Sequence, residues 1–212
     1  MKLVDLSVKD FLNIVDSKSP APGGGSVSAL VSSLGCTLGR MVAHLTFDKK
    51  KYKELPLEDQ EKFKKSFEEI EKYRYLLEEL VDKDTEAYNL VMVAYKLPKE
   101  TEEEKLVRKE NIEKNLKLAI ETPMGICNIS AKVLMLLKEI LKHGNKNAIT
   151  DLGVAAILLY SGIEGGVLNV KVNLGGLSDD KFKNETLETL DEILKKSKLE
   201  RDEILESVNS CL

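Results

Sequence analysis

The residue best suited to acid–base chemistry is Asp84. Between residues 57 and 97, apolar side chains recur at steps of three and four, and this inward stripe includes position 84. A carboxylate among apolar neighbours is costly to bury unless it is paired, hydrogen-bonded or functional. Two interpretations therefore stay open for Asp84: a catalytic carboxylate, or a salt bridge inside a bundle with Arg40 or Arg108.

A second candidate is the loop that runs from Pro20 through Pro22, Gly23, Gly24 and Gly25 to Ser26. An apolar segment follows at once, so the loop is expected to open a helix. Free N–H groups and the positive end of the helix dipole favour anions there. The loop lacks the Gly-Lys-Ser/Thr ending of a Walker A motif and follows no predicted strand. A tight turn that merely caps the helix is the alternative.

Several other polar residues could contact a substrate. Four asparagines could line a site for a ring rich in amide and amine groups: Asn145, Asn147, Asn169 and Asn173. Alternatively, they could form a turn and ordinary interhelical hydrogen bonds. A lysine run from Lys49 to Lys53 follows the apolar segment, either to bind substrate carboxylates or to compensate the helix dipole. Helix capping explains Asp151 as well as a catalytic role does.

Other classes of chemistry have little support. His44 and His143 have no evident Ser or Cys partner for a catalytic triad. Three widely spaced cysteines without a CxxC pair predict neither a zinc site nor a disulfide framework. The 32 basic and 36 acidic residues give a net charge of -4, which argues against broad nucleic-acid binding. The chain does not open on a basic stretch and an apolar core, so we expect no signal peptide and a cytoplasmic location.

The elements that must position these residues are predicted to be helices. The chain is rich in Leu, Lys and Glu, with no Trp and five Pro, and its 212 residues suit one large domain over 1–212. Capping and periodicity predict helices from Ser7, over 27–45, over 57–97, from Thr101 to His143, from Thr150 or Asp151 to about 174, and after a Ser178 cap. Pro123 is expected to kink or restart the helix that begins at Thr101. Residues 168–174 alternate like a strand, but a lone strand would lack a pairing partner.

Two predicted helices have faces of small residues. Gly35, Gly39 and Ala43 are spaced four apart, and Gly162 and Gly166 repeat the pattern later. Another helix can approach such a face closely, from this subunit or from a partner. The segment 27–45 approaches the length of a membrane span. Its Ser, Gly and Ala content, and the expectation of no second span, favour a helix at the centre of the fold.

The sequence resembles a known family at several of these motifs. Residues 19–26, and residues 41–46 with their lysine run, resemble the formiminotetrahydrofolate cyclodeaminase/methenyltetrahydrofolate cyclohydrolase family, which also supplies the C-terminal domain of formiminotransferase-cyclodeaminase. The likeness covers nearly the whole chain and continues through residues 84–88, 97–99, Pro123, 144–147, 151–155 and 169–173.

This resemblance implies an all-α bundle of long helices that forms a closely packed or intertwined homodimer, with a folate site near the glycine loop. It implies Asp84 and Asp151 as catalytic residues, and a set of substrate-binding residues: Pro22, Gly23, Gly24, Gly25, Ser26, Lys50, Lys51, Tyr88, Asn145, Asn147, Asn169 and Asn173. No metal and no cofactor beyond the tetrahydrofolate substrate are expected. We favour methenyltetrahydrofolate cyclohydrolase, with formiminotetrahydrofolate cyclodeaminase and a non-catalytic folate-binding or scaffold dimer as alternatives.

Overall fold

The computed structural model describes residues 2–212, and its regular elements are all helices. They are α1 (Val8–Val15), α2 (Gly24–Phe47), α3 (Lys50–Lys53), α4 (Leu57–Tyr95), α5 (Glu102–His143), α6 (Ile149–Leu174) and α7 (Asp180–Asn209), with short 3-10 helices η1 (Leu3–Asp5) and η2 (Lys146–Ala148). No strand occurs among the described residues, so the all-α prediction is confirmed.

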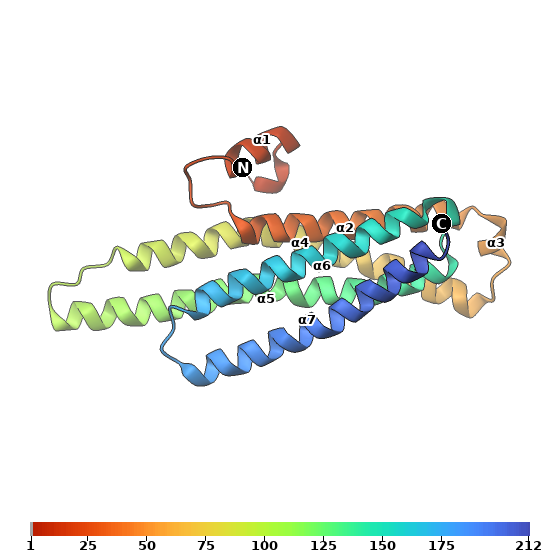
Figure 1. The fold of residues 1–212 in the computed structure, drawn as a ribbon. Helices are drawn as coiled ribbons and strands as arrows, with labels where there is room; N and C mark the ends of the chain where they lie inside the picture. The colour runs from red at the N-terminus through yellow and green to blue at the C-terminus, as the bar shows by residue number, and fades with distance from the viewer. Residues whose placement is uncertain (1) are drawn as a thin grey trace.

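Four long helices, α2, α4, α5 and α6, pack side by side, and α7 packs on α5 and α6 (Figure 1). The helices α4 and α5 are 39 and 42 residues long, against 24 for α2. They consequently project beyond the first residue of α2 at the end where the α4–α5 loop lies (Figure 1). The segment with α1 lies over the beginning of α2. The site described below lies where the long pair overhangs α2.

Capping explains where several helices begin. The Ser7 hydroxyl accepts a hydrogen bond from the amide of Asp10, and Thr101 forms a full capping box with Glu104, as predicted. Two other predicted caps are wrong. Helix α6 begins at Ile149 without a side-chain cap, because the chain enters it directly from η2. Helix α7 is capped by Asp179, whose carboxylate accepts from the amide of Phe182, so Ser178 lies one residue outside the cap.

The long periodic segments form long continuous helices. Residues 57–95 are one helix, and 168–174 belong to α6, as predicted. Helix α5 does not restart at Pro123 but runs through it. A proline inside a helix leaves the carbonyl four residues earlier without its amide partner. That carbonyl, on Ala119, accepts a hydrogen bond of 2.9 Å from the side-chain amide of Asn173. A second helix thus satisfies the group that Pro123 leaves free.

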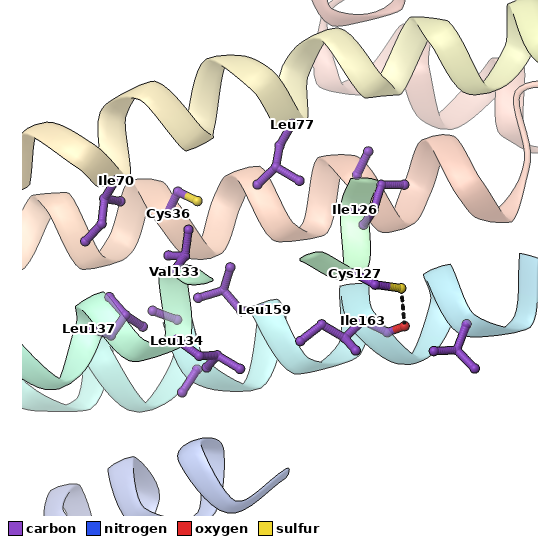
Figure 2. Packing of buried hydrophobic residues seen from close by; sticks show 14 of the residues in the cluster. Cys36, Ile70, Leu77, Ile126, Cys127, Val133, Leu134, Leu137, Leu159 and Ile163 are labelled. Atoms are coloured by element: carbon purple, nitrogen blue, oxygen red, sulfur yellow. Dashed lines mark hydrogen bonds between the residues drawn. The ribbon is translucent and has the colours of Figure 1, made fainter. Parts of the chain in front are cut away.

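The core lies between α2, α4, α5 and α6 (Figure 2). Its side chains are almost all aliphatic, and the two inner thiols join them as predicted: Cys36 and Cys127 are fully buried. A β-carbon added to Gly35 would stand 2.8 Å from Cγ of Leu159, and one on Gly162 would stand 1.9 Å from Oγ of Ser32. The predicted close approach is therefore confirmed, and the helix that approaches α2 is α6 of the same chain.

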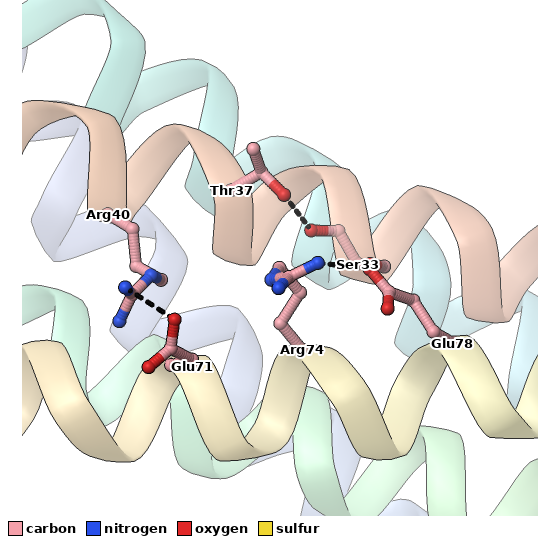
Figure 3. Close-up of polar contacts among 6 residues, drawn as sticks. All are labelled: Ser33, Thr37, Arg40, Glu71, Arg74 and Glu78. Carbon is pink, nitrogen blue, oxygen red and sulfur yellow. Dashed lines mark hydrogen bonds and ion pairs between the residues drawn. The ribbon is translucent and has the colours of Figure 1, made fainter.

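A polar layer ties α2 to α4 away from the site (Figure 3). Arg40 donates to Glu71 over 2.8 Å and lies on the Phe67 ring, with its guanidinium carbon 3.8 Å from the ring centre. Arg74 and Glu78, which lie one and two turns after Glu71 on α4, form a second ion pair. Arg40 also donates to the carbonyl of Phe67, so its guanidinium is held beside residues 67 and 71 of α4 and does not pair with Asp84.

Two helices are long and apolar enough to span a membrane, 24–47 and 146–174, so the expectation of no second span is wrong. The physical reason is that α6 shares the Ser, Gly and aliphatic composition of α2. In each helix more than half of the apolar window, 61% and 56%, is buried within the bundle. Helix α2 is nevertheless not covered all round: Leu34 and Leu45 are 49% and 47% exposed on its outer side.

Candidate active site

A cavity of about 420 Å³ lies where α4, α5 and α6 extend past the beginning of α2. The loop before α2 forms one side of this cavity. The other walls are mostly apolar or aromatic, and their three polar side chains are those of Asp84, Asn169 and Asn173. The lining residues are Pro20, Ala21, Gly23, Gly24, Asp84, Tyr88, Val91, Met92, Tyr95, Leu116, Ala119, Asn169, Val172, Asn173 and Gly176.

Asp84 caps helix α2 from a neighbouring helix. Gly23 occupies the N-cap position of α2 and has no side chain to accept from the first turn. Instead, Oδ2 of Asp84 accepts from the backbone amide of Ser26 at 2.9 Å and from its hydroxyl at 3.2 Å. The free amides and the dipole at a helix start stabilise a carboxylate at this point. The glycine loop and Asp84 are therefore one structural unit.

The glycine at position 25 is required by this contact. A β-carbon there would stand 2.0 Å from Oδ1 of Asp84, well inside contact distance. At position 24 the nearest atom to an added β-carbon is Nδ2 of Asn169, at 3.2 Å. The anion that the start of α2 was predicted to favour is, within this chain, the carboxylate of Asp84.

Asp84 is half-buried, and its electrostatic environment is unusual. Burial raises the pKa of its carboxyl above the ordinary value, and the two hydrogen bonds from Ser26 oppose that rise. No ion pair among residues 2–212 includes Asp84. The salt-bridge interpretation is wrong here, because Arg40 pairs with Glu71 and Arg108 donates to the carbonyl of Tyr95. Asp84 is a carboxylate beside a cavity with no cationic partner.

Two asparagines on α6, Asn169 and Asn173, line the cavity. The amide nitrogen of Asn173 is held by the Ala119 carbonyl at 2.9 Å, and that of Asn169 by the Gly165 carbonyl at 2.8 Å. With each nitrogen engaged, each side-chain oxygen remains to accept from a ligand. Asp84 and these oxygens form an acceptor-rich wall that suits a ring bearing N–H and NH2 donors.

Sequence reasoning found part of this site and missed part of it. Gly23, Gly24, Tyr88, Asn169 and Asn173 line the cavity with Asp84. The remaining loop residues, Pro22, Gly25 and Ser26, are buried behind it. The missed residues are Val91, Met92 and Tyr95 on α4, Leu116 and Ala119 on α5, Val172 on α6, and Gly176 just after α6. Tyr95 lies on the same inward-facing stripe as Asp84, so the sequence pattern could have identified Tyr95 as a site residue.

The other predicted residues lie at the opposite end of the bundle. Lys50, Lys51, Asn145 and Asn147 line a separate pocket of about 330 Å³, together with Thr46, Lys49, Tyr52, His143, Gly144 and Lys146. The 24 residues of α2 separate the two pockets, which at 1.5 Å per residue is about 36 Å. Asp151 lies at this end too, in the first turn of α6.

One chain therefore does not bring all the predicted site residues together. The physical reason is that periodicity predicts which face of a helix points inward and says nothing of which end of the bundle a residue occupies. The roles of Lys50, Lys51, Asn145, Asn147 and Asp151 stay predictions. Among residues 2–212 no group of three His, Cys, Asp or Glu side chains is placed to hold a metal ion.

The fold and the cavity define a class of helical-bundle protein with a carboxylate seated on a glycine-rich helix start. The family model described as formiminotransferase-cyclodeaminase matches residues 7–192, and the chain belongs to this family. The resemblance seen in the sequence is thereby confirmed.

Similar proteins are named as folate enzymes. The chain is 37% identical over 204 residues to a methenyltetrahydrofolate cyclohydrolase of Methylorubrum extorquens, covering 96% of each protein. It is 31% identical to the formimidoyltransferase-cyclodeaminase of Rattus norvegicus but spans only 38% of that longer protein. A solved structure of formiminotetrahydrofolate cyclodeaminase from Thermotoga maritima superposes with a TM-score of 0.77 at 30% identity, over 98% of this chain and 96% of the other.

Proposed function

We propose that this chain is a methenyltetrahydrofolate cyclohydrolase, which adds water to 5,10-methenyltetrahydrofolate and releases 10-formyltetrahydrofolate. The observation that carries the proposal is the partly buried carboxylate of Asp84, which caps the start of α2 and has no cationic partner among residues 2–212. The relative that bears this name matches the chain over nearly the whole length of both proteins.

The methenyl bridge is a cation shared between N5 and N10, so a carboxylate beside it favours binding of the substrate, and the same carboxylate can assist the attack as a base. Water adds to the bridging carbon and gives up one proton to Asp84 as the base. The hydroxyl of the resulting tetrahedral carbon then loses its proton as the bond to N5 breaks, and N5 takes up a proton. The sum consumes one water, releases one proton and leaves the formyl group on N10.

The raised pKa of Asp84 suits this exchange. A carboxyl whose pKa is closer to neutrality accepts a proton from water more readily than an ordinary aspartate, and it can return the proton to the leaving nitrogen. In this proposal the oxygens of Asn169 and Asn173 orient the pterin, and Tyr88 contacts its face. The reaction as written requires no metal and no cofactor besides the folate substrate.

The main alternative is formiminotetrahydrofolate cyclodeaminase, the activity named for the similar solved structure. There N10 attacks the formimino carbon, ammonia leaves and the methenyl bridge forms. Both reactions pass through a tetrahedral carbon between the same two nitrogens, and the same carboxylate serves both. The third alternative is a folate-binding dimer without activity.

One absorbance assay separates the three. Loss of the methenyltetrahydrofolate absorbance on adding the protein supports the hydrolase. A rise of the same absorbance from formiminotetrahydrofolate, with ammonia released, would instead assign the deaminase. Tight folate binding with neither change would favour the binding protein. The proposal includes a cytoplasmic location and a homodimer, which fractionation and sedimentation test.

A further inference from the structure

Ser26 belongs to the loop that the sequence singled out for substrate binding, yet a substrate in the cavity cannot touch its side chain. Ser26 is fully buried and does not line the cavity at Asp84. Its nearest link to the cavity is the carboxylate of Asp84, to which it is hydrogen-bonded. Any effect of Ser26 on the proposed reaction must therefore pass through Asp84.

The hydroxyl of Ser26 has one proton and two competing acceptors. Its oxygen lies 2.7 Å from the carbonyl oxygen of Val81 and 3.2 Å from Oδ2 of Asp84. A serine hydroxyl donates one hydrogen bond and rotates to the better acceptor. The shorter distance favours donation to Val81 in this structure. Thr85, whose hydroxyl oxygen is 3.3 Å from that of Ser26, can then donate to Ser26.

The carbonyl of Val81 does not depend on Ser26. It lies inside α4, where a helical carbonyl accepts from the amide four residues later. The hydrogen bond from Ser26 is an additional one, so its loss leaves no buried acceptor unpaired. The hydroxyl can consequently leave Val81 when a stronger acceptor is beside it.

The two carboxylate oxygens of Asp84 have different surroundings. Oδ2 accepts from the backbone amide of Ser26 at 2.9 Å and faces the Ser26 hydroxyl. Oδ1 accepts no hydrogen bond from residues 2–212 and is not enclosed by them. Oδ2 is thus the oxygen that anchors the side chain, and Oδ1 is the one that a water or a substrate can reach.

We propose that Ser26 is a positioning residue for Asp84, and that its hydroxyl changes acceptor each time the carboxylate gains or loses a proton. While Asp84 is ionised, the hydroxyl donates to Oδ2, because a carboxylate is a stronger acceptor than an amide carbonyl. When Oδ1 has taken a proton, the hydroxyl returns to the Val81 carbonyl.

The proton in this cycle is the one that Asp84 takes from the attacking water, so the inference rests on the proposed function for its source. The O–H bond of the water breaks as the water oxygen bonds to the bridging carbon of the folate, and the proton goes to Oδ1. No covalent bond of Ser26 changes, since only its hydrogen bond moves. Ser26 thereby stabilises the ionised form of Asp84 without contacting the substrate.

No charged side chain around the cavity offers another means of control. Burial raises the pKa of Asp84, and the hydroxyl and the amide of Ser26 are the groups that oppose the rise. Helix α2 has no ionisable residue before Cys36. The titratable residues that line the cavity with Asp84 are Tyr88 and Tyr95.

The other elements present uncharged residues to the cavity. The loop before α2 contributes Pro20, Ala21 and Gly23, and α5 and α6 contribute Leu116, Ala119, Asn169, Val172 and Asn173. The charged residues near Asp84 in the α4 sequence, Asp82, Lys83 and Glu86, line a separate groove together with Lys2.

The first experiment compares pH profiles of kcat/KM. Ser26→Ala removes the hydroxyl and keeps the backbone amide, so the ionised carboxylate loses one donor and the pKa of Asp84 rises. We expect the acid limb of the profile to move up by about one pH unit, which is about tenfold lower activity at a given pH on that limb. Above the limb, the two proteins should agree. A loss of equal size at every pH would indicate a purely structural role and overturn the inference.

The matched control is Ser28→Ala. Ser28 lies in the same part of α2, is 7% exposed and donates to the Gly24 carbonyl at 2.6 Å, with no hydrogen bond to Asp84. Its acid limb should coincide with that of the wild type. If Ser28→Ala moved the limb as far as Ser26→Ala does, the shift would come from looser packing of α2, and the inference would fail.

The second experiment requires no substrate. With carbon-13 at the aspartate carboxyls, NMR follows their titration, and the signal that Asp84→Asn removes belongs to Asp84. Its midpoint should rise by about one pH unit in Ser26→Ala and stay in place in Ser28→Ala. An unchanged midpoint in Ser26→Ala overturns the inference. If the wild-type protein turns over neither folate, the proposed function fails, while this titration still decides the role of Ser26.

Discussion

Oδ1 of Asp84 stands where a β-carbon of residue 25 would need to be, at a separation of only 2.0 Å. The absence of a side chain on Gly25 is what allows the carboxylate to reach the first turn of α2. We therefore expect Gly25→Ala to move Asp84 out of the site and abolish most of the activity. The overpacked position should also lower the free energy of unfolding by about 1–3 kcal/mol, as urea titration would measure.

The control for this change is Gly153→Ala, because the nearest atom to a β-carbon there is a Val208 methyl at 3.4 Å. Ordinary contact and the better helix propensity of alanine predict unchanged turnover and no loss of stability. A Gly25→Ala protein with full activity would remove the argument that this glycine positions Asp84.

Asp84 itself is expected to be indispensable for turnover. Asp84→Asn retains an oxygen for the Ser26 amide and removes both the negative charge and the proton acceptor. We expect kcat to fall about 10²–10⁴-fold, the usual contribution of a positioned acid or base, with normal circular dichroism. If the purified variant turned over both folates at the wild-type rate, Asp84 would not be the catalytic carboxylate.

The same substitution should make the protein more stable at neutral pH. Because burial raises the pKa of Asp84 in the folded state, the folded protein binds this proton more tightly than the unfolded chain does. The ionised carboxylate therefore costs stability above the raised pKa, and the cost disappears as the pH falls below the ordinary value for aspartate. Melting temperatures of wild type and Asp84→Asn should differ at pH 7 and converge at low pH. A wild type that is the more stable protein at pH 7 would contradict this.

Pro123 should influence substrate binding through Asn173. In Pro123→Ala, residue 123 regains an amide that can donate to the Ala119 carbonyl, which now accepts from Asn173. Asn173 would lose its fixed orientation, and KM should rise about tenfold, the equivalent of one hydrogen bond, with kcat little changed. Steady-state kinetics provide the measurement, and an unchanged KM would mean that Asn173 does not orient the substrate.

The three thiols should differ sharply in reactivity. Burial raises the pKa of Cys36 and of Cys127 to about 12, whereas Cys211 is exposed. Since the thiolate is the reactive form, a disulfide reagent at pH 8 should modify one thiol in the native protein and three in urea. Rapid modification of a second native thiol would indicate that the core opens.

The sequence predicted the helices well because their signals are local. Periodicity and caps located α4 and the start of α5, and four-residue glycine spacing predicted that another helix can approach α2 closely, without showing that this helix is α6 of the same chain. A restart at Pro123 was wrong, because the compensating donor is Asn173, which is 50 residues away in the sequence. The inward position of Asp84 was predictable, but its partner Ser26 was not.

For the same reason, helical periodicity could not predict how the candidate site residues are divided between the two ends of the bundle. Asp151 and Asn169 are on one helix, yet they are 18 positions apart and so about 27 Å from each other along the axis. Sequence spacing shows that both residues belong to helix α6, but it does not show which end of the helix binds a ligand. Only the three-dimensional arrangement reveals two separate pockets.

The hydrogen bond between Ser26 and Asp84 joins residues 58 positions apart, and this makes it a sensor of native packing. It exists only while α2 and α4 lie in register. A collapsed intermediate that kept its helices and lost fixed side-chain packing would look native by far-ultraviolet circular dichroism, yet it would have no anchored carboxylate. Recovery of activity during refolding should consequently report the docking of α2 on α4, later than the formation of either helix.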